Sequence, residues 1–271
     1  MTTPTRDRGA GDVDDDVDRG TVGAGRSSRR RPDERIARFV ARALGDARTV
    51  LNVGAGSGSY ENAARAVTAV EPSASVRALR PAPLVRAVDA SDASDAVDAV
   101  AEHLPFADGE FDAAMTLFSV HQWSDPWAGL REMRRVTRGP VVVLTRDPAR
   151  VRDFWLYRYA PEVLDTEARR HPAVGELAAA LGGDCGVTTV PIPLDCTDGF
   201  DEAYYGRPEM LLDPAARQAC SAWSFVDDRV REHFDRTLRA DLESGAWDAE
   251  FGHLRRQPAY DGSLVVVRAT P

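Results

Sequence analysis

The sequence predicts an α/β fold in which a doubly wound, mostly parallel sheet carries helices on both faces. Apolar runs of strand length alternate along the chain with segments whose apolar residues recur at helical spacing. This alternation is typical of parallel strands joined by helices. The chain has 271 residues, 43% of them hydrophobic, which is enough to bury one full-sized core of this class.

One domain preceded by a tail is expected. Residues 1–31 are rich in Gly, Asp, Arg and Ser and contain almost nothing that could be buried, so they are predicted to be disordered. The domain then spans residues 32–271, with halves at 32–147 and 148–271. A helical insertion is expected at about residues 196–260, because the last two predicted strands lie much farther apart than a hairpin requires.

Two helices have clear sequence signals. The first is expected to begin within residues 32–34, where proline and acidic residues suit a first turn, and to end at Gly45. Between them, Ile36, Val40 and Leu44 recur at helical spacing. The second helix is expected over Pro126–Val136.

Seven strands are expected in the sheet: Thr49–Val53, Val67–Val70, Leu84–Val88, Phe111–Leu117, Val141–Leu144, Val187–Leu194 and Leu264–Val267. Only about a dozen residues separate Gly54 from the second strand, close to the minimum for a parallel crossover. The helix there must be very short or replaced by a loop. Residues 90–97 belong to a low-complexity stretch, which is predicted to be an inserted loop or a mobile helix.

Composition excludes several function classes. The net charge of −9 lacks the positive field that non-specific nucleic-acid binding needs. No apolar run approaches the ~20 residues of a membrane span, and the N-terminus lacks a secretory signal, so a cytoplasmic protein is expected. Cys185, Cys196 and Cys220 show no metal-binding or disulfide spacing and are expected to be reduced thiols, with no metal site.

The most informative segment is VLNVGAGSGSYE, Val50 to Glu61. A buried strand leads into Gly54, Gly56 and Gly58, which let the backbone turn sharply and approach a ligand closely. The second strand ends in Glu71, whose carboxylate can accept hydrogen bonds from both hydroxyls of a ribose. The pattern therefore predicts a nucleoside-containing ligand at the carboxyl ends of the strands.

The glycine spacing narrows the choice of nucleotide. A dinucleotide fingerprint needs its last glycine at position 59, which is Ser59. A phosphate loop needs a lysine, and the chain has none. A nicotinamide-dependent oxidoreductase is therefore disfavoured.

The G-x-G-x-G pattern resembles the first motif of class I S-adenosylmethionine-dependent methyltransferases. Residues 103–113, HLPFADGEFDA, resemble the LPF-x-D-x-x-FD signature of the family-11 branch. Residues 117–136, LFSVHQWSDPWAGLREMRRV, resemble the loop and helix that follow in that branch, and residues 137–140 stand where its RPGG turn is usual. The resemblance covers about residues 33–147 and implies a Rossmann-like fold, with residues 32–147 as the cofactor-binding half.

By position, the resemblance implies contacts to S-adenosylmethionine from ten residues: Asn52, Gly54, Ala55, Gly56, Gly58, Glu71, Pro72, Asp98, Ala99 and Leu117. The glycine loop would lie under the methionine part, Glu71 would hold the ribose, and Leu117 would line the sulfonium pocket. Asp98 best matches the acid that contacts adenine, although Asp89 has a similar sequence context and competes for that role. Asn52 stands where the family often has Asp, so it keeps an acceptor but loses a charge.

Methyl transfer is an in-line displacement that needs alignment above all, and a general base only when the nucleophile holds a proton. His121 follows the fourth strand and is the candidate base, with simple packing in the loop as the alternative. The other histidines, His103, His171, His233 and His253, are expected at the surface.

The second half is expected to cover the substrate. Its pocket is predicted to be walled by aromatic residues, with core packing as the alternative: Trp123, Trp155, Tyr204 and Tyr205. The helical insertion could instead serve stability or form a homodimer. Arg146, Arg158 or Arg207 could bind a substrate carboxylate, although a solvated arginine is the default.

The leading hypothesis is methyl transfer from S-adenosylmethionine to an O, N or C atom of a small organic metabolite. The alternative is a non-catalytic or regulatory S-adenosylmethionine-binding protein on the same fold. Asn52 and the short first crossover slightly favour this alternative.

Overall fold

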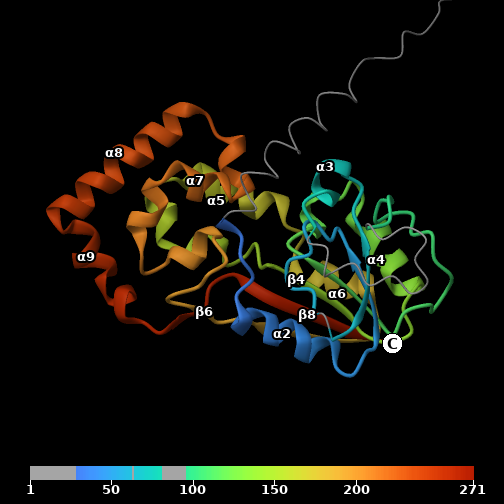
Figure 1. Ribbon diagram of the computed structural model, residues 1–271. Coiled ribbons are helices and arrows are strands. Elements are labelled where there is room, and N and C mark those ends of the chain that lie inside the picture. The colour runs from blue at the N-terminus through green and yellow to red at the C-terminus, as the bar shows by residue number, and fades with distance from the viewer. Residues whose placement is uncertain (1–28, 63, 81–95) are drawn as a thin grey trace, which may run out of the picture.

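The computed structural model describes residues 29–62, 64–80 and 96–271 (Figure 1). Its centre is a six-stranded sheet with the order β2-β1-β3-β4-β8-β5. The strands are β1 (Thr49–Val53), β2 (Ala66–Val70), β3 (Ala113–Leu117), β4 (Val141–Arg146), β5 (Asp184–Thr189) and β8 (Leu264–Thr270). Strands β1 to β4 run parallel, and β8 is antiparallel to both of its neighbours. The expected mostly parallel α/β sheet is confirmed.

Helices cover both faces of the sheet, because the apolar side chains of its central strands point to both faces. On one face, Val142 and Leu144 of β4 share a core with α2 (Glu34–Leu44). On the other face, Val141 and Val143 share a core with α4 (Pro126–Arg135) and α6 (Val174–Leu181). Successive side chains of a strand point to opposite faces, so a strand that is apolar throughout is buried on both sides.

The two helices with clear sequence signals begin where they were expected, and the structure shows how each start is capped. The Asp33 side chain accepts a hydrogen bond from the backbone N–H of Arg35 at the start of α2, which ends at Gly45. The Asp125 side chain accepts from two backbone N–H groups at the start of α4, whose first residue is Pro126. The short crossover is also confirmed as a loop, since no helix forms in the described residues between β1 and β2.

Two strand predictions need comment. The predicted strand Leu84–Val88 lies outside the described residues, so the described sheet has six strands, not seven. At the sheet edge, Val97 forms an isolated parallel bridge with Val70. The prediction of one strand over Val187–Leu194 was wrong: β5 ends at Thr189 and β6 (Ile192–Pro193) begins a separate small sheet with β7 (Ala259–Tyr260). Pro191 lies between them and has no N–H to donate to a ladder.

The second half of the chain forms the expected helical layer at one side of the sheet (Figure 1). Its elements are η3 (Val151–Asp153), η4 (Trp155–Arg158), α5 (Pro161–Arg170), η5 (Asp201–Tyr204), η6 (Pro208–Leu212), α7 (Pro214–Gln218), η7 (Ser221–Phe225), α8 (Asp228–Ser244), α9 (Ala246–Phe251) and η8 (Gly252–Arg256). Within the described residues, every helix is too short or too polar to cross a membrane.

The described structure begins at Arg29, three residues before the expected domain start. Arg30 donates to the carboxylate of Asp198, with 2.5 Å between Nε and Oδ1. Asp198 belongs to the second half of the chain, residues 148–271, called the helical half below. The side chain of Asp198 is 2% exposed, so this contact is part of the folded domain. The disorder predicted for residues 1–28 lies outside the described residues.

Candidate functional site

A cavity of about 550 Å³ lies at the carboxyl ends of β1, β2 and β3. Its walls come from residues 54–57 after β1, Glu71 after β2 and residues 117–119 after β3. The helical half supplies the opposite wall through α5 and η7. Ligands of open α/β sheets bind at this edge.

Glycine is required where the chain turns after β1. Gly54 and Gly56 have φ angles of 66° and 55°, in the left-handed region that other residues rarely adopt. A Cβ atom on Gly54 would overlap the Oγ of Ser119, which accepts a hydrogen bond from the indole N–H of Trp123 at 3.0 Å. A Cβ on Gly56 would meet nothing within 4 Å. The turn therefore packs tightly against the loop after β3 and opens onto the cavity.

The carboxylate of Glu71 meets this turn directly. The backbone N–H of Gly56 donates to Glu71 Oε2 at 3.0 Å, and the N–H of Ser73 donates to Oε1 at 3.0 Å. Each carboxylate oxygen keeps a further lone pair that can accept a hydrogen bond. The glycine turn and the acid at the end of β2, both expected to contact one cofactor molecule, thus line one cavity. Pro72 follows, and its carbonyl accepts from Arg77 at 2.9 Å.

Asn52 presents an unpaired acceptor in the cavity wall. Its side chain is buried, and its Nδ2 donates to Glu61 Oε1 at 2.8 Å. Glu61 also forms a buried ion pair with Arg80, with 2.7 Å between Nη2 and Oε2. An ionised carboxylate only accepts, so it fixes which end of the Asn52 amide faces it. The Oδ1 atom then has no partner among the described residues.

The acids expected near adenine are not brought to the cavity wall in the described residues. The Asp98 side chain is 72% exposed and pairs with Arg77 at 3.2 Å. Neither Asp98 nor Ala99 lines the cavity, and Asp89 falls outside the described residues. Leu117 does line the cavity, at the end of β3, where the resemblance implies the sulfonium pocket.

His121 lies in η2 (Val120–Gln122) and lines the cavity. Its ring stacks on that of His171, with 4.2 Å between the ring centroids. The expectation that His171 lies at the surface was wrong, since it is 5% exposed. Its Nδ1 is 3.0 Å from Thr145 Oγ1, and its Nε2 is 3.2 Å from Glu167 Oε1. The candidate base thus rests on a buried, hydrogen-bonded imidazole that no sequence motif marks.

The carboxyl of Glu167 is held ionised beneath this pair of rings. Burial alone would raise its pKa, because a charge loses hydration in the interior. The guanidinium of Arg146, 3.4 Å away, and His171 outweigh burial and hold the pKa of Glu167 well below its usual range. The buried groups next to His121 are therefore charged and compensate one another.

The aromatic residues predicted to wall the substrate pocket pack elsewhere. Trp155 donates from its indole N–H to the carbonyl of Tyr205 at 2.9 Å and packs edge-on against Trp247. Tyr204 and Tyr205 are also buried in the helical half. These residues and Trp123 are absent from the cavity wall. Their sequence signal, a cluster of large apolar rings, fits core packing equally well.

Another part of the cavity wall is formed by Phe118, Arg30 and Asp198, and the last two belong to no sequence motif. The guanidinium of Arg30 lies 4.8 Å from the centroid of the Phe118 ring. Tyr60 donates its hydroxyl to Asp198 at 2.7 Å. Arg30 and Asp198 are 168 positions apart, so no local pattern could have paired them.

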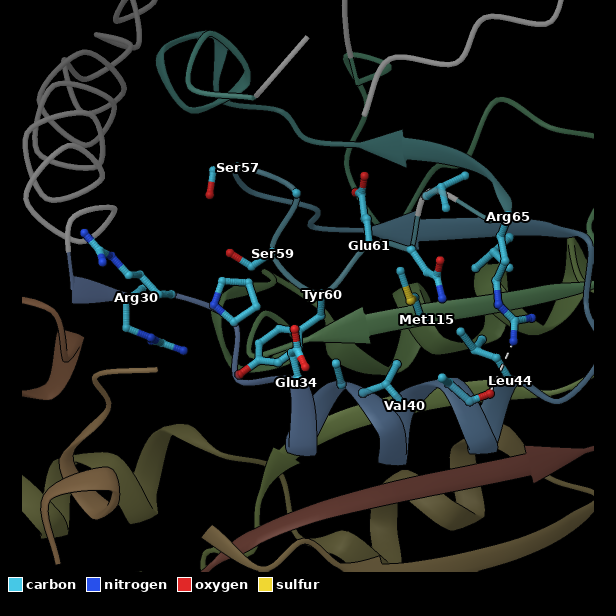
Figure 2. Close-up of a pocket in the computed structure, with 18 of the residues that line it drawn as sticks. Arg30, Glu34, Val40, Leu44, Ser57, Ser59, Tyr60, Glu61, Arg65 and Met115 are labelled. Atoms are coloured by element: carbon cyan, nitrogen blue, oxygen red, sulfur yellow. Dashed lines mark hydrogen bonds between the residues drawn. The ribbon is translucent and has the colours of Figure 1, made fainter. Parts of the chain in front are cut away.

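A second hollow of about 730 Å³ lies beside the cavity, behind the glycine loop. Figure 2 shows α2 along one side of it, with Val40 and Leu44 facing inward, and Tyr60 at one end. Val67 of β2 and Met115 of β3 form its other walls. A crossover helix between β1 and β2 would cover this part of the sheet. The short loop leaves it open.

Comparison with known proteins gives two informative similarities. The model of a family described as a methyltransferase domain, Methyltransf_11, matches residues 51–143. A crystal structure from Anabaena variabilis ATCC 29413, of a protein assigned as a methyltransferase of an antibiotic biosynthesis pathway, has a TM-score of 0.79. It is 26% identical, and the match covers 89% of this chain and 99% of that one.

A shorter similarity is to the uncharacterised protein YafE of Escherichia coli (strain K12). It is 40% identical over 80 residues, which are 28% of this chain and 38% of YafE. The chain therefore matches well under two thirds of that relative's length.

Proposed function

Because this chain carries an S-adenosylmethionine-dependent class I methyltransferase domain of Rossmann-like fold at residues 51–143, we propose that it methylates an O, N or C atom of a small organic metabolite. The observation that carries the proposal is the hydrogen bond of 3.0 Å between the Gly56 N–H and the Glu71 carboxylate, both in the wall of one cavity.

The residues present fit S-adenosylmethionine. The Glu71 carboxylate, fixed by two backbone N–H groups, would accept hydrogen bonds from the ribose hydroxyls. The unpaired Oδ1 of buried Asn52 would accept one from the ammonium of the methionine part. Gly56, on which a Cβ would meet nothing within 4 Å, leaves room for that part above the turn. When bound, S-adenosylmethionine supplies a methyl group activated by its positively charged sulfur.

The chain itself would align the acceptor, exclude water and remove a proton. The helical half covers the cavity, so the acceptor is held away from bulk water. His121 lines the same cavity, and its neutral imidazole would take a proton from an acceptor that holds one. Stacking on His171 would keep the His121 ring in a fixed orientation.

Three observations support a small acceptor. The cavity of about 550 Å³ falls in the range of ~300–1,000 Å³ usual for small-molecule sites. The net charge of −9 disfavours a nucleic-acid acceptor. The Anabaena relative's assignment to antibiotic biosynthesis points in the same direction.

Calorimetry followed by a transfer assay tests this function. We expect micromolar binding of S-adenosylmethionine and of S-adenosylhomocysteine, and no binding of NAD. Labelled S-adenosylmethionine incubated with a small-metabolite extract should then give a labelled product. Absence of cofactor binding would refute the proposal. Binding without transfer would identify a non-catalytic S-adenosylmethionine-binding protein.

A further inference from the structure

We propose that the acceptor molecule carries a carboxylate and that Arg170 binds it at the end of the cavity formed by the helical half. This proposal rests on the proposed function and names the substrate class of the same site.

Arg170 is the last residue of α5. It lines the cavity from the helical half, whereas Glu71 lines it from the first half of the chain. Its Nη1 donates to Ser221 Oγ at 2.8 Å, and its guanidinium lies 4.5 Å from the centroid of the Phe225 ring. The hydroxyls of Ser221 and Ser224 belong to the same wall. Cation, ring and hydroxyls therefore come together where a substrate would lie beside the cofactor.

The charge of Arg170 has no direct counterion. Across residues 29–62, 64–80 and 96–271, no carboxylate oxygen lies within the 4.0 Å of an ion pair from its guanidinium. Burial lowers the pKa of Arg170, while the more distant Glu167 offsets only part of this effect. A cation that has lost hydration without gaining an ion pair is stabilised by an anionic ligand.

The other charged groups of the cavity are already engaged. Arg30 is bonded to Asp198, with 2.5 Å between Nε and Oδ1, so this pair is neutral overall. Glu71 accepts from two backbone N–H groups at the cofactor end. Arg170 is therefore the charge left to select a substrate among the described lining residues.

The arginines favoured from sequence do not take this role. Arg146 pairs with Glu167 at 3.4 Å, beneath the cavity. Arg158 pairs with Asp241 and Glu250 on the helical half. Arg207 donates to the backbone carbonyls of Cys196 and Ala203 at 3.0 and 2.9 Å. None of the three lines the cavity of about 550 Å³ that Arg170 lines.

Geometry and charge favour a carboxylate over a phosphate. The Phe225 ring lies against the guanidinium, so a ligand would approach the free edge, where two parallel N–H groups match a carboxylate. One arginine balances one negative charge, whereas a phosphate monoester carries about −1.5 to −2 at neutral pH. The Glu71 carboxylate in the same cavity disfavours the additional charge.

Thermal unfolding of the protein saturated with S-adenosylhomocysteine tests this. The probes are three carboxylates with their primary amides (benzoate and benzamide, phenylacetate and phenylacetamide, hexanoate and hexanamide) and inorganic phosphate. We expect at least one carboxylate to raise Tm by about 3–5 °C at tenfold over its Kd, and its amide to give no shift. No shift from any carboxylate, equal shifts from acid and amide, or a shift from phosphate alone would overturn the proposal.

Variants assign the effect to Arg170. In Arg170→Gln and Arg170→Lys, calorimetry should give a carboxylate Kd raised by about tenfold or more, the scale of a lost charged hydrogen bond. Arg169→Gln is the matched control, since Arg169 is the exposed neighbour that bonds Thr166. Unchanged carboxylate binding in Arg170→Gln would refute the assignment.

Cofactor titration separates the two proposals. If S-adenosylhomocysteine binds to wild type and to Arg170→Gln alike, the cofactor site holds and only the substrate class is at stake. If it binds to neither, the proposed function itself fails.

Discussion

At the scale of single residues, Glu71 is central to the proposed cofactor site, because its carboxylate joins the glycine turn to the end of β2. Replacing Glu71 with Ala should weaken S-adenosylmethionine binding by about 10- to 100-fold, the scale of ~1.5–3 kcal/mol for hydrogen bonds to a charged group. Calorimetry measures the change, with Glu243→Gln on the exposed side of α8 as control. An unaltered Kd in Glu71→Ala would place the ribose elsewhere.

His121 is the residue proposed to take part in the chemistry. If it removes a proton from the acceptor, His121→Ala should lower kcat by ~100-fold or more and leave the cofactor Kd nearly unchanged. Steady-state kinetics with the identified acceptor would measure this. His103→Gln, on an exposed histidine outside the cavity, should behave as wild type. A kcat loss of only a few fold would leave His121 a packing role.

At the scale of elements, the unusual feature is the short crossover between β1 and β2. It is a loop, and Arg65 at its end donates to the carbonyls of Ala47 at 2.6 Å and of Gly45 at 2.7 Å. These bonds satisfy backbone acceptors just beyond the end of α2. One side chain thus ties α2 to the edge of the sheet where a crossover helix is absent.

Arg65→Met should therefore destabilise the protein. We expect the free energy of unfolding to fall by about 1.5–3 kcal/mol, because the carbonyls lose a charged donor. Urea unfolding would measure the loss, with Arg38→Met on the exposed face of α2 as control. Equal stability of the two variants would contradict this role for Arg65.

Local patterns predicted the elements that depend on local physics. The helix starts near Asp33 and Pro126 follow from proline and acidic residues that suit a first turn, and the positions of most strands follow from apolar runs. The strand bounds followed less closely, since β3 begins at Ala113 and not at Phe111. The β5–β6 break was missed although Pro191 signals it. The cavity wall made by Arg30, Asp198 and Arg170 could not be predicted, because Arg30 meets Asp198 across 168 positions and Arg170 meets Ser221 across 51, and such contacts leave no local spacing to recognise.

At the scale of the whole molecule, polar contacts fasten the start of the fold to the helical half. Asp33 accepts from the backbone N–H of Thr197 at 3.1 Å, and Arg35 reaches Asp195 at 2.6 Å. Burial would raise the pKa of Asp33, but hydrogen bonds from Arg35 and Thr197 lower it to about 2. The carboxylate form is thus favoured in the folded state.

The lowered pKa of Asp33 makes the free energy of unfolding depend on pH. The folded pKa is depressed, so the contribution of Asp33 is complete above the unfolded value near 3.8 and is lost as pH falls toward 2. We expect wild type to lose on the order of 1 kcal/mol through this group between pH 5 and pH 2, allowing for solvent screening. Asp33→Asn should be less stable at pH 7 and flatter over that interval in urea titrations. Parallel curves would contradict the linkage.

Asp198 receives hydrogen bonds from two sides, Arg30 of the N-terminal segment and Tyr60 of the loop after β1. Tyr60 keeps a left-handed backbone, with φ of 67°, that its ring alone would not favour. The loop after β1, which lines the proposed cofactor site, is therefore bonded to the helical half through Asp198. If the helical half moves away from the cavity to release a product, we expect the loop after β1 to loosen with it. The demethylated cofactor and the methylated product of the proposed reaction would then leave through one motion.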